Sequence, residues 1–70
     1  MSYYFFHVVG SNHGQFRDGS GLDFNTLEDA ARHAAKIADE LAQDGDHYRG
    51  SAVSVTDEDD NELLRVTVEP

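Results

Sequence analysis

Residues 3–9 of the chain read Tyr3-Tyr4-Phe5-Phe6-His7-Val8-Val9, and this aromatic and β-branched stretch favours a strand. Successive side chains of a strand point to opposite faces. Tyr4, Phe6 and Val8 therefore share one face, and Tyr3, Phe5 and His7 share the other. Both faces are apolar, but the pattern leaves open which of them is buried, because a one-residue change of register exchanges them.

A helix is predicted between Thr26 and Gly45. Thr26 is a suitable N-cap with Asp29 at the third helical position, and Gly45 is a typical stop. His33 is expected on the polar side, in a surface pair with Asp29. At about 100° per residue the apolar residues fall in one stripe rich in alanine, so the helix axis is expected close to a sheet. The stripe comprises Leu27, Ala30, Ala31, Ala34, Ile37, Ala38 and Leu41, with the three larger residues as its anchors.

Two further strands are predicted at residues 51–56 and 62–68, joined by a hairpin turn at 57–61, where Asp and Asn tolerate left-handed backbone. In residues 15–24, the segment Asp18-Gly19-Ser20-Gly21 interrupts the apolar pattern, so a short second strand can lie on either side of it. The predicted fold is one α+β domain over residues 1–70. Its antiparallel sheet has three or four strands with one helix packed on one face, in the order β(β)αββ.

The composition limits the function. Five Lys and Arg stand against fourteen Asp and Glu, for a formal net charge of -9, and the chain has no cysteine. So few basic residues argue against nucleic acids and anionic membrane surfaces as partners. The absence of cysteine excludes disulfides and thiolate metal sites. Because there is no apolar run of about 18 residues and no signal-like N-terminus, a cytoplasmic location is expected.

The polar residues show no catalytic or metal-binding pattern. The four histidines lack the spacing of zinc sites. Asp57-x-Asp59-x-Asn61 resembles the start of a calcium loop, but Glu62 and Val68 occupy the positions that need Gly and a bidentate Glu. Nucleophile elbows and phosphate-binding loops are absent from the sequence. We therefore expect no enzymatic activity, no catalytic residues, no bound metal and no cofactor.

Three motifs carry a family resemblance. They are Tyr-Tyr-Phe-Phe-His at 3–7, Leu-Glu-Asp-Ala-Ala at 27–31 and Val-Thr-Asp-Glu-Asp at 55–59. In this order they resemble a family of small domains of unknown function that is common in rhizobia and other alphaproteobacteria. That family usually has Asp-Gly in the hairpin, where this chain has Asp60-Asn61. The resemblance implies a small α+β fold and supplies no catalytic residues.

The leading functional hypothesis is a non-enzymatic protein-interaction module. One helix covers one face of a sheet, so the aromatic side chains on the other face imply a partner, a ligand or tolerated exposure. Self-association is the simplest form, because a two-fold interface uses one patch twice. The candidate contact residues are Tyr3, Phe5, His7 and Leu63.

The alternative is an acidic regulatory subunit that binds a small basic protein. The chain is also similar to antitoxin subunits of the HicB type, which place a strand, a Gly-rich turn and a Leu-Glu-Asp-Ala-like helix in this order and bind a small basic toxin. The Pro-containing stretch before that helix is missing here. The candidate acidic docking residues are Asp39, Glu40, Asp44, Asp46, Asp57, Glu58, Asp59 and Asp60.

Overall fold

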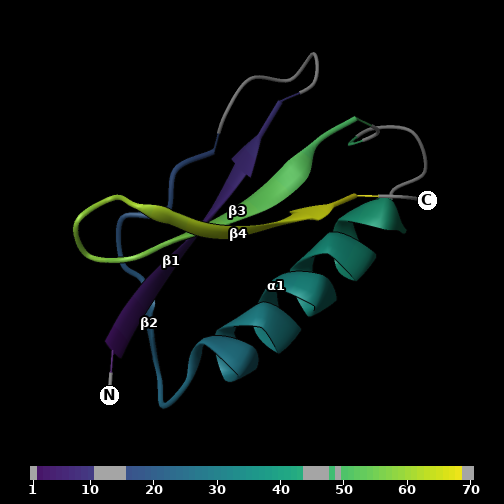
Figure 1. The fold of residues 1–70 in the computed structure, drawn as a ribbon. Coiled ribbons are helices and arrows are strands. Elements are labelled where there is room, and N and C mark those ends of the chain that lie inside the picture. The colour runs from purple at the N-terminus through teal and green to yellow at the C-terminus, as the bar shows by residue number, and fades with distance from the viewer. Residues whose placement is uncertain (1, 11–15, 44–47, 49, 69–70) are drawn as a thin grey trace.

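The structure, a computed structural model, describes residues 2–10, 16–43, 48 and 50–68. Its elements are β1 (Ser2–Val9), β2 (Leu22–Phe24), α1 (Leu27–Ala42), β3 (Ala52–Thr56) and β4 (Glu62–Thr67). The strands form one antiparallel sheet in the order β2-β1-β3-β4, and α1 lies across one face of it (Figure 1). This arrangement confirms the predicted fold class and element order.

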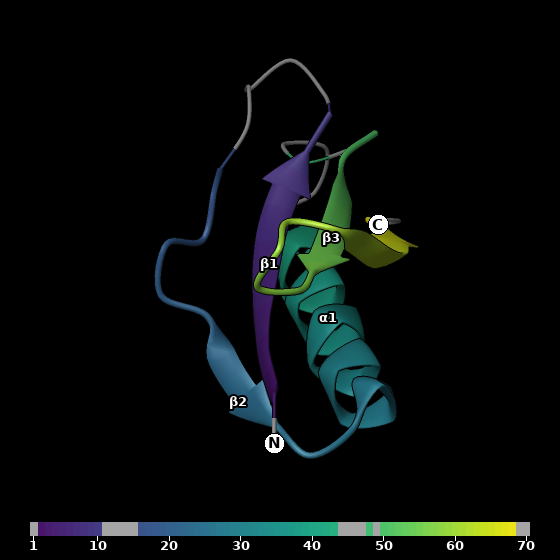
Figure 2. The same ribbon diagram turned by 60° about the vertical axis from the view of Figure 1, so that its left-hand side comes forward.

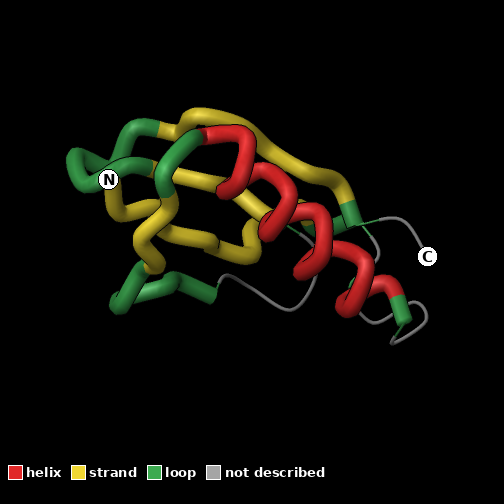
Figure 3. Tube along the Cα trace, turned by 90° about the horizontal axis from the view of Figure 1, so that it is seen from below, coloured by secondary structure: helices red, strands yellow, loops and turns green. Residues whose placement is uncertain are grey.

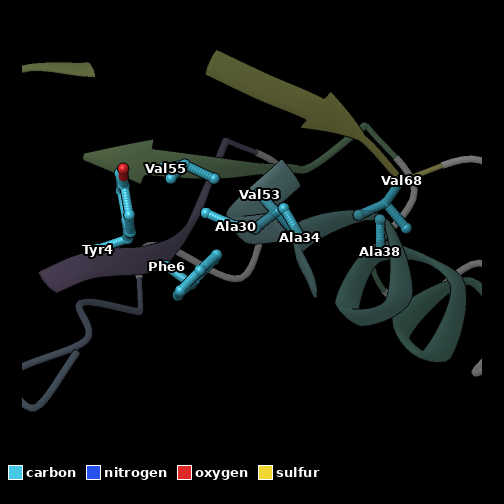
Figure 4. Packing of buried hydrophobic residues seen from close by; sticks show 8 residues of the cluster. All are labelled: Tyr4, Phe6, Ala30, Ala34, Ala38, Val53, Val55 and Val68. Carbon is cyan, nitrogen blue, oxygen red and sulfur yellow. The ribbon is translucent and has the colours of Figure 1, made fainter. Parts of the chain in front are cut away.

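The face of β1 that turns toward the helix carries Tyr4 and Phe6, which are 8% and 6% exposed. Phe6 lies opposite Val55 of β3, and Val8 lies opposite Val53, so the row of β1 continues into a row of buried valines. Figure 4 shows Phe6, Val53 and Val55 beside Ala30 and Ala34 of the helix. The structure therefore settles the open question of which face of the first strand is buried.

The helix touches the sheet through its alanines. Ala30, Ala34 and Ala38 are all buried, and small side chains at these positions let the helix axis approach the valines of β3. The helix packs mainly on β3 and β4 and reaches β2 near its start (Figures 2 and 3). Thr26 caps it as predicted, because its Oγ1 accepts a hydrogen bond of 3.1 Å from the Asp29 N–H.

Two details of the helix differ from the prediction. Leu27 is 39% exposed instead of anchoring the stripe. His33 is half-buried, with its ring 4.9 Å from that of Phe6 and 5.4 Å from that of Phe24. The reason is the position of the helix over β3 and β4, which leaves the space beside β1 and β2 to aromatic rings and to the flank of the helix that carries His33.

The described helix ends at Ala42, with Gln43 as its C-cap, and the predicted stop at Gly45 lies outside the described residues. Within the described ranges, no helix combines the length and the apolar character that a bilayer crossing requires.

Residues on both sides of the predicted interruption at 18–21 pair with the outer edge of β1. After it, β2 pairs with the start of β1, and Tyr4 lies opposite Leu22. Before it, Phe16 and Val8 exchange two backbone hydrogen bonds of 2.9 Å. Residues 17–21 loop out between these two contacts. The second strand is therefore one edge segment with a break in its middle.

We expect that a larger side chain at the helix–sheet contact will destabilise the domain. Ala34→Leu puts three more carbons where the side chain is fully buried against the sheet, so it should lower the free energy of unfolding by about 1–3 kcal/mol. Ala35→Leu is the matched control, because Ala35 is exposed and leucine is nearly as good a helix former. Urea unfolding followed by circular dichroism measures both. Equal stability of the two variants would show that the alanine contact is not tightly packed.

Candidate functional site

The outer face of the sheet, away from the helix, carries Tyr3, Phe5 and His7 as the alternation predicts. Their exposures differ: Tyr3 is 49% exposed, Phe5 is half-buried and His7 is only 6% exposed. Ser54 and Thr56 of β3, which lie opposite His7 and Phe5, are buried as well. The outer face therefore has an aromatic end at Tyr3 and a covered polar centre around His7.

Asp18 fills the break in the edge segment. Its carboxylate accepts hydrogen bonds from the Phe6 N–H at 3.3 Å, the Ser20 N–H at 3.0 Å and the Gly21 N–H at 3.1 Å. The Phe6 N–H points toward the edge of β1, between two β1 residues that pair with the edge segment. The Asp18 carboxylate therefore accepts the hydrogen bond that a backbone carbonyl of a neighbouring strand would otherwise accept. Burial raises the pKa of Asp18, but the hydrogen bonds from the Ser20, Gly21 and Phe6 amides outweigh it and hold the pKa below its ordinary value of 3.8.

His7 has both ring nitrogens engaged. The Asp18 N–H donates to Nδ1 at 3.0 Å, so Nδ1 is an acceptor and the ring proton sits on Nε2. Nε2 then donates to the Thr56 Oγ1 at 2.9 Å. This buried, neutral ring has no free lone pair for proton transfer, and it does not present the surface contact that we predicted. Its role here is to fasten the 17–21 loop to the sheet.

Gly21 also holds the loop close to the sheet, because it lies directly against the Phe5 ring. Its φ of +72° lies in the left-handed region, where glycine is favoured. A Cβ at this position would lie 2.8 Å from the Phe5 ring, so only glycine lets the loop pass so close. The loop thus covers part of the ring, and the rest of Phe5 borders an open hollow in the outer face.

The hollow has a volume of about 240 Å³. Its sheet residues are Phe5, His7 and Thr56. Its other residues come from two segments that are far apart in the sequence, the loop after Phe16 and the β3–β4 turn: Arg17, Asp18, Asp57, Glu58 and Asp60. Small-molecule sites usually measure about 300–1,000 Å³, so this hollow suits one side chain better than a whole metabolite.

The β3–β4 turn is held by its own first carboxylate. Asp57 accepts hydrogen bonds from the Asp59 N–H and the Asn61 N–H, both at 2.9 Å, and from the Asn61 Nδ2 at 3.2 Å. The Asn61 N–H is the main reason that the pKa of Asp57 is lowered. Asp60 has a φ of 68°, the left-handed backbone that the sequence predicted for this turn. Among the described residues, no group of three or more His, Cys, Asp or Glu is arranged to hold a metal ion.

The hollow is negatively charged. Four carboxylates and one guanidinium line it, which gives a formal charge of 1 - 4 = -3. Arg17 lies 3.3 Å from Asp60, and both side chains are 67% exposed. Glu58 has neither a hydrogen bond nor an ion pair within the described part of the chain. The site can therefore attract a cation that also contacts an aromatic ring.

The predicted contact residues form no single patch. Tyr3 and Phe5 are neighbours on the outer face of β1. Leu63 is the extra residue of a bulge in β4, between the partners of Val55 and Thr56, and is 39% exposed. Since β3 lies between β1 and β4, the two parts are about 10 Å apart at the usual strand spacing.

The predicted acidic residues are also divided. Asp39 and Glu40 lie near the end of α1, at the opposite end of the molecule from the β3–β4 turn (Figure 1). Asp44 and Asp46 lie outside the described residues. Among the described acidic candidates, those that border the hollow are Asp57, Glu58 and Asp60 of the turn. There they meet Arg17 and Asp18, which the sequence analysis did not single out. The Asp-Gly-Ser-Gly segment was the signal that could have identified Asp18, because Asp commonly accepts hydrogen bonds from the backbone two or three residues ahead.

The chain was compared with known protein families, curated proteins and solved structures. A family model described as a domain of unknown function (DUF6894) matches residues 3–69. No curated protein and no solved structure matches the chain.

We expect the Asp18 carboxylate to stabilise the fold in a pH-dependent way. Because its pKa is lowered in the fold, its contribution is present above the ordinary value of 3.8 and is lost as the pH falls through the lower folded value. Asp18→Asn should cost about 1–2 kcal/mol at pH 7. The gap from the original protein should close as the pH falls below 3.8 and through the lower folded pKa, since a protonated carboxyl resembles the amide.

Urea unfolding at a series of pH values measures this gap, with Asp23→Asn, at an exposed position of β2, as the control. A gap that stays constant at every pH would contradict the role assigned to the charged carboxylate.

Proposed function

Because the chain belongs to this family of domains of unknown function, DUF6894, we propose a function from its own geometry: it is a non-enzymatic interaction module that receives a cationic side chain of a protein partner. The hollow in the outer face carries this proposal. It joins the ring of Phe5 to four carboxylates and a single guanidinium. An aromatic ring beside an excess of negative charge is a surface that fits lysine or arginine.

Three physical properties support binding of a cation. Asp18 and Asp57 are both ionised at neutral pH, because their ordinary pKa of 3.8 lies far below it and is lowered further in the fold. A cation over an exposed aromatic ring gains about 0.5–1 kcal/mol. The net charge of -9 extends this attraction to longer range and favours a basic partner over an acidic one.

Binding is favoured over catalysis by the state of His7. Both of its nitrogens are used in holding the loop, so the His7 imidazole, which borders the hollow, is committed to structure. A general acid or base needs a group that can exchange a proton with the substrate.

The proposal predicts that the hollow binds a short basic peptide. The probe is acetyl-Gly-Arg-Gly-Arg-Gly-amide, titrated into ¹⁵N-labelled protein, with the Gln-for-Arg peptide as the uncharged control. We expect amide shifts to move around Phe5, Arg17 and the β3–β4 turn, and binding to weaken by about tenfold between 20 mM and 200 mM salt, because exposed charges are screened.

A matched pair of variants tests the location. Glu58→Gln with Asp60→Asn removes two charges beside the hollow and should weaken binding several-fold. Asp39→Asn with Glu40→Gln removes two charges near the end of α1 and should have a much smaller effect. Equal weakening by the two pairs would show that net charge alone attracts the peptide, and would overturn the assignment to the hollow.

Self-association is a second candidate, and the exposure of Tyr3 beside Phe5 is the observation that favours it. A second copy that packs on this aromatic end would remove it from water. The two copies would each carry a charge of -9, so their repulsion must be screened before the apolar contact can form.

Salt therefore separates the two candidates, because it should strengthen a contact between two copies and weaken binding of a basic partner. Light scattering behind a sizing column should show a larger mass at high salt, and Tyr3→Ser should abolish the increase. Leu22→Ser is the control, because the register places Leu22 with Tyr4 on the helix side of the sheet. A monomer at every salt concentration would rule out self-association at the concentrations tested.

A further inference from the structure

We infer that Arg17 occupies the place of a partner's arginine, so that the hollow is a seat for a guanidinium group and the chain carries its own weak competitor. This inference rests on the proposed function and specifies its ligand. It follows from the way in which Arg17 is paired, from the cost of releasing it, and from the firm attachment of the backbone on either side of it.

The pairing of Arg17 differs from that of the other paired arginines. Arg32 pairs with Glu28 one helical turn away, and Arg65 pairs with Glu62 on the same strand. Such pairs follow from local geometry. The Arg17–Asp60 pair instead joins positions 43 residues apart and links the two segments that border the hollow. A guanidinium is thus already bound to a carboxylate of the proposed site.

The pair is weak enough to be exchanged. Both side chains are 67% exposed and make a single contact of 3.3 Å. Exposed ion pairs of this kind contribute little to stability, because water screens the charges and both long side chains lose freedom when they pair. An incoming guanidinium can therefore replace Arg17 at Asp60 at little cost, which a buried pair would not permit.

The backbone on both sides of Arg17 is held independently of this pair. Phe16 is hydrogen-bonded to Val8, and Asp18 is hydrogen-bonded to Phe6 and His7. The Arg17 side chain can therefore swing away while the loop stays in place. The ring of Phe5, the turn carboxylates and the shape of the hollow then remain available to the partner.

A guanidinium fits this seat better than an ammonium. Its planar group can stack on the Phe5 ring while it donates two hydrogen bonds to one carboxylate, and lysine offers neither the plane nor the fork. The inference thus predicts that the arginine peptide binds more tightly than the same peptide with lysine.

Replacement of Arg17 should improve binding. Arg17→Gln removes the internal competitor, so the arginine peptide should bind about two- to fivefold more tightly, which is the fold-change that matches release from an exposed ion pair. Arg32→Gln is the matched control, because it removes the same charge from the surface of α1 and should leave affinity nearly unchanged. The measurement is the titration described above, made with arginine and lysine peptides.

A double-mutant cycle separates competition from a general charge effect. If Arg17 acts by occupying Asp60, then Arg17→Gln should improve binding much less when Asp60 is already Asn. Asn tolerates the left-handed backbone at this position, so the turn should keep its shape. An undiminished gain in the Asp60→Asn background would overturn the placeholder role.

The remaining outcomes are also distinct. If the original protein binds the arginine peptide at the hollow but Arg17→Gln improves binding no more than Arg32→Gln does, this inference fails and the proposed function stands. If lysine and arginine peptides bind equally, the preference for guanidinium fails. If neither the original protein nor Arg17→Gln binds either peptide, both the inference and the proposed function fail.

Discussion

The structure depends on one constraint: β1 is apolar on both faces, and one helix covers only one of them. On the inner face, small alanines bring the helix close enough to bury Tyr4 and Phe6 against the valines of β3. On the outer face, the 17–21 loop covers part of the sheet, as a second layer would. Asp18 replaces a missing strand neighbour, and Gly21 lies against Phe5. Both solutions depend on residues that are small or that bond to their own backbone.

The hollow is a consequence of this second cover. The backbone of the loop covers His7 and part of Phe5, and the space between it and the β3–β4 turn is lined by Arg17 and four carboxylates. The groups that shape the hollow are therefore the groups that stabilise the sheet. His7 illustrates the point, since its two hydrogen bonds connect the loop to β3 and leave the imidazole with a structural role.

The sequence was sufficient to predict the fold but not the candidate site. Alternation in β1, the Thr26 cap and the alanine stripe each follow from local periodicity, and the structure confirms all three. The cover over His7 depends on contacts between residues that are 11 and 49 positions apart, which no local pattern contains. His33 was misplaced for a similar reason: its position on the helix is polar by period, but the offset of the helix puts Phe6 and Phe24 beside it.

The bulge at Leu63 bears on how this protein behaves when it is crowded. A strand at the edge of a sheet offers a row of unsatisfied amides and carbonyls to any similar strand, and long flat edges are where fibrils begin to grow. On one side of this sheet the edge is broken by the 17–21 loop, and on the other the bulge in β4 disturbs a regular pairing surface. Neither edge is a good template for another copy, so the high β content of this small chain does not commit it to cross-β aggregation.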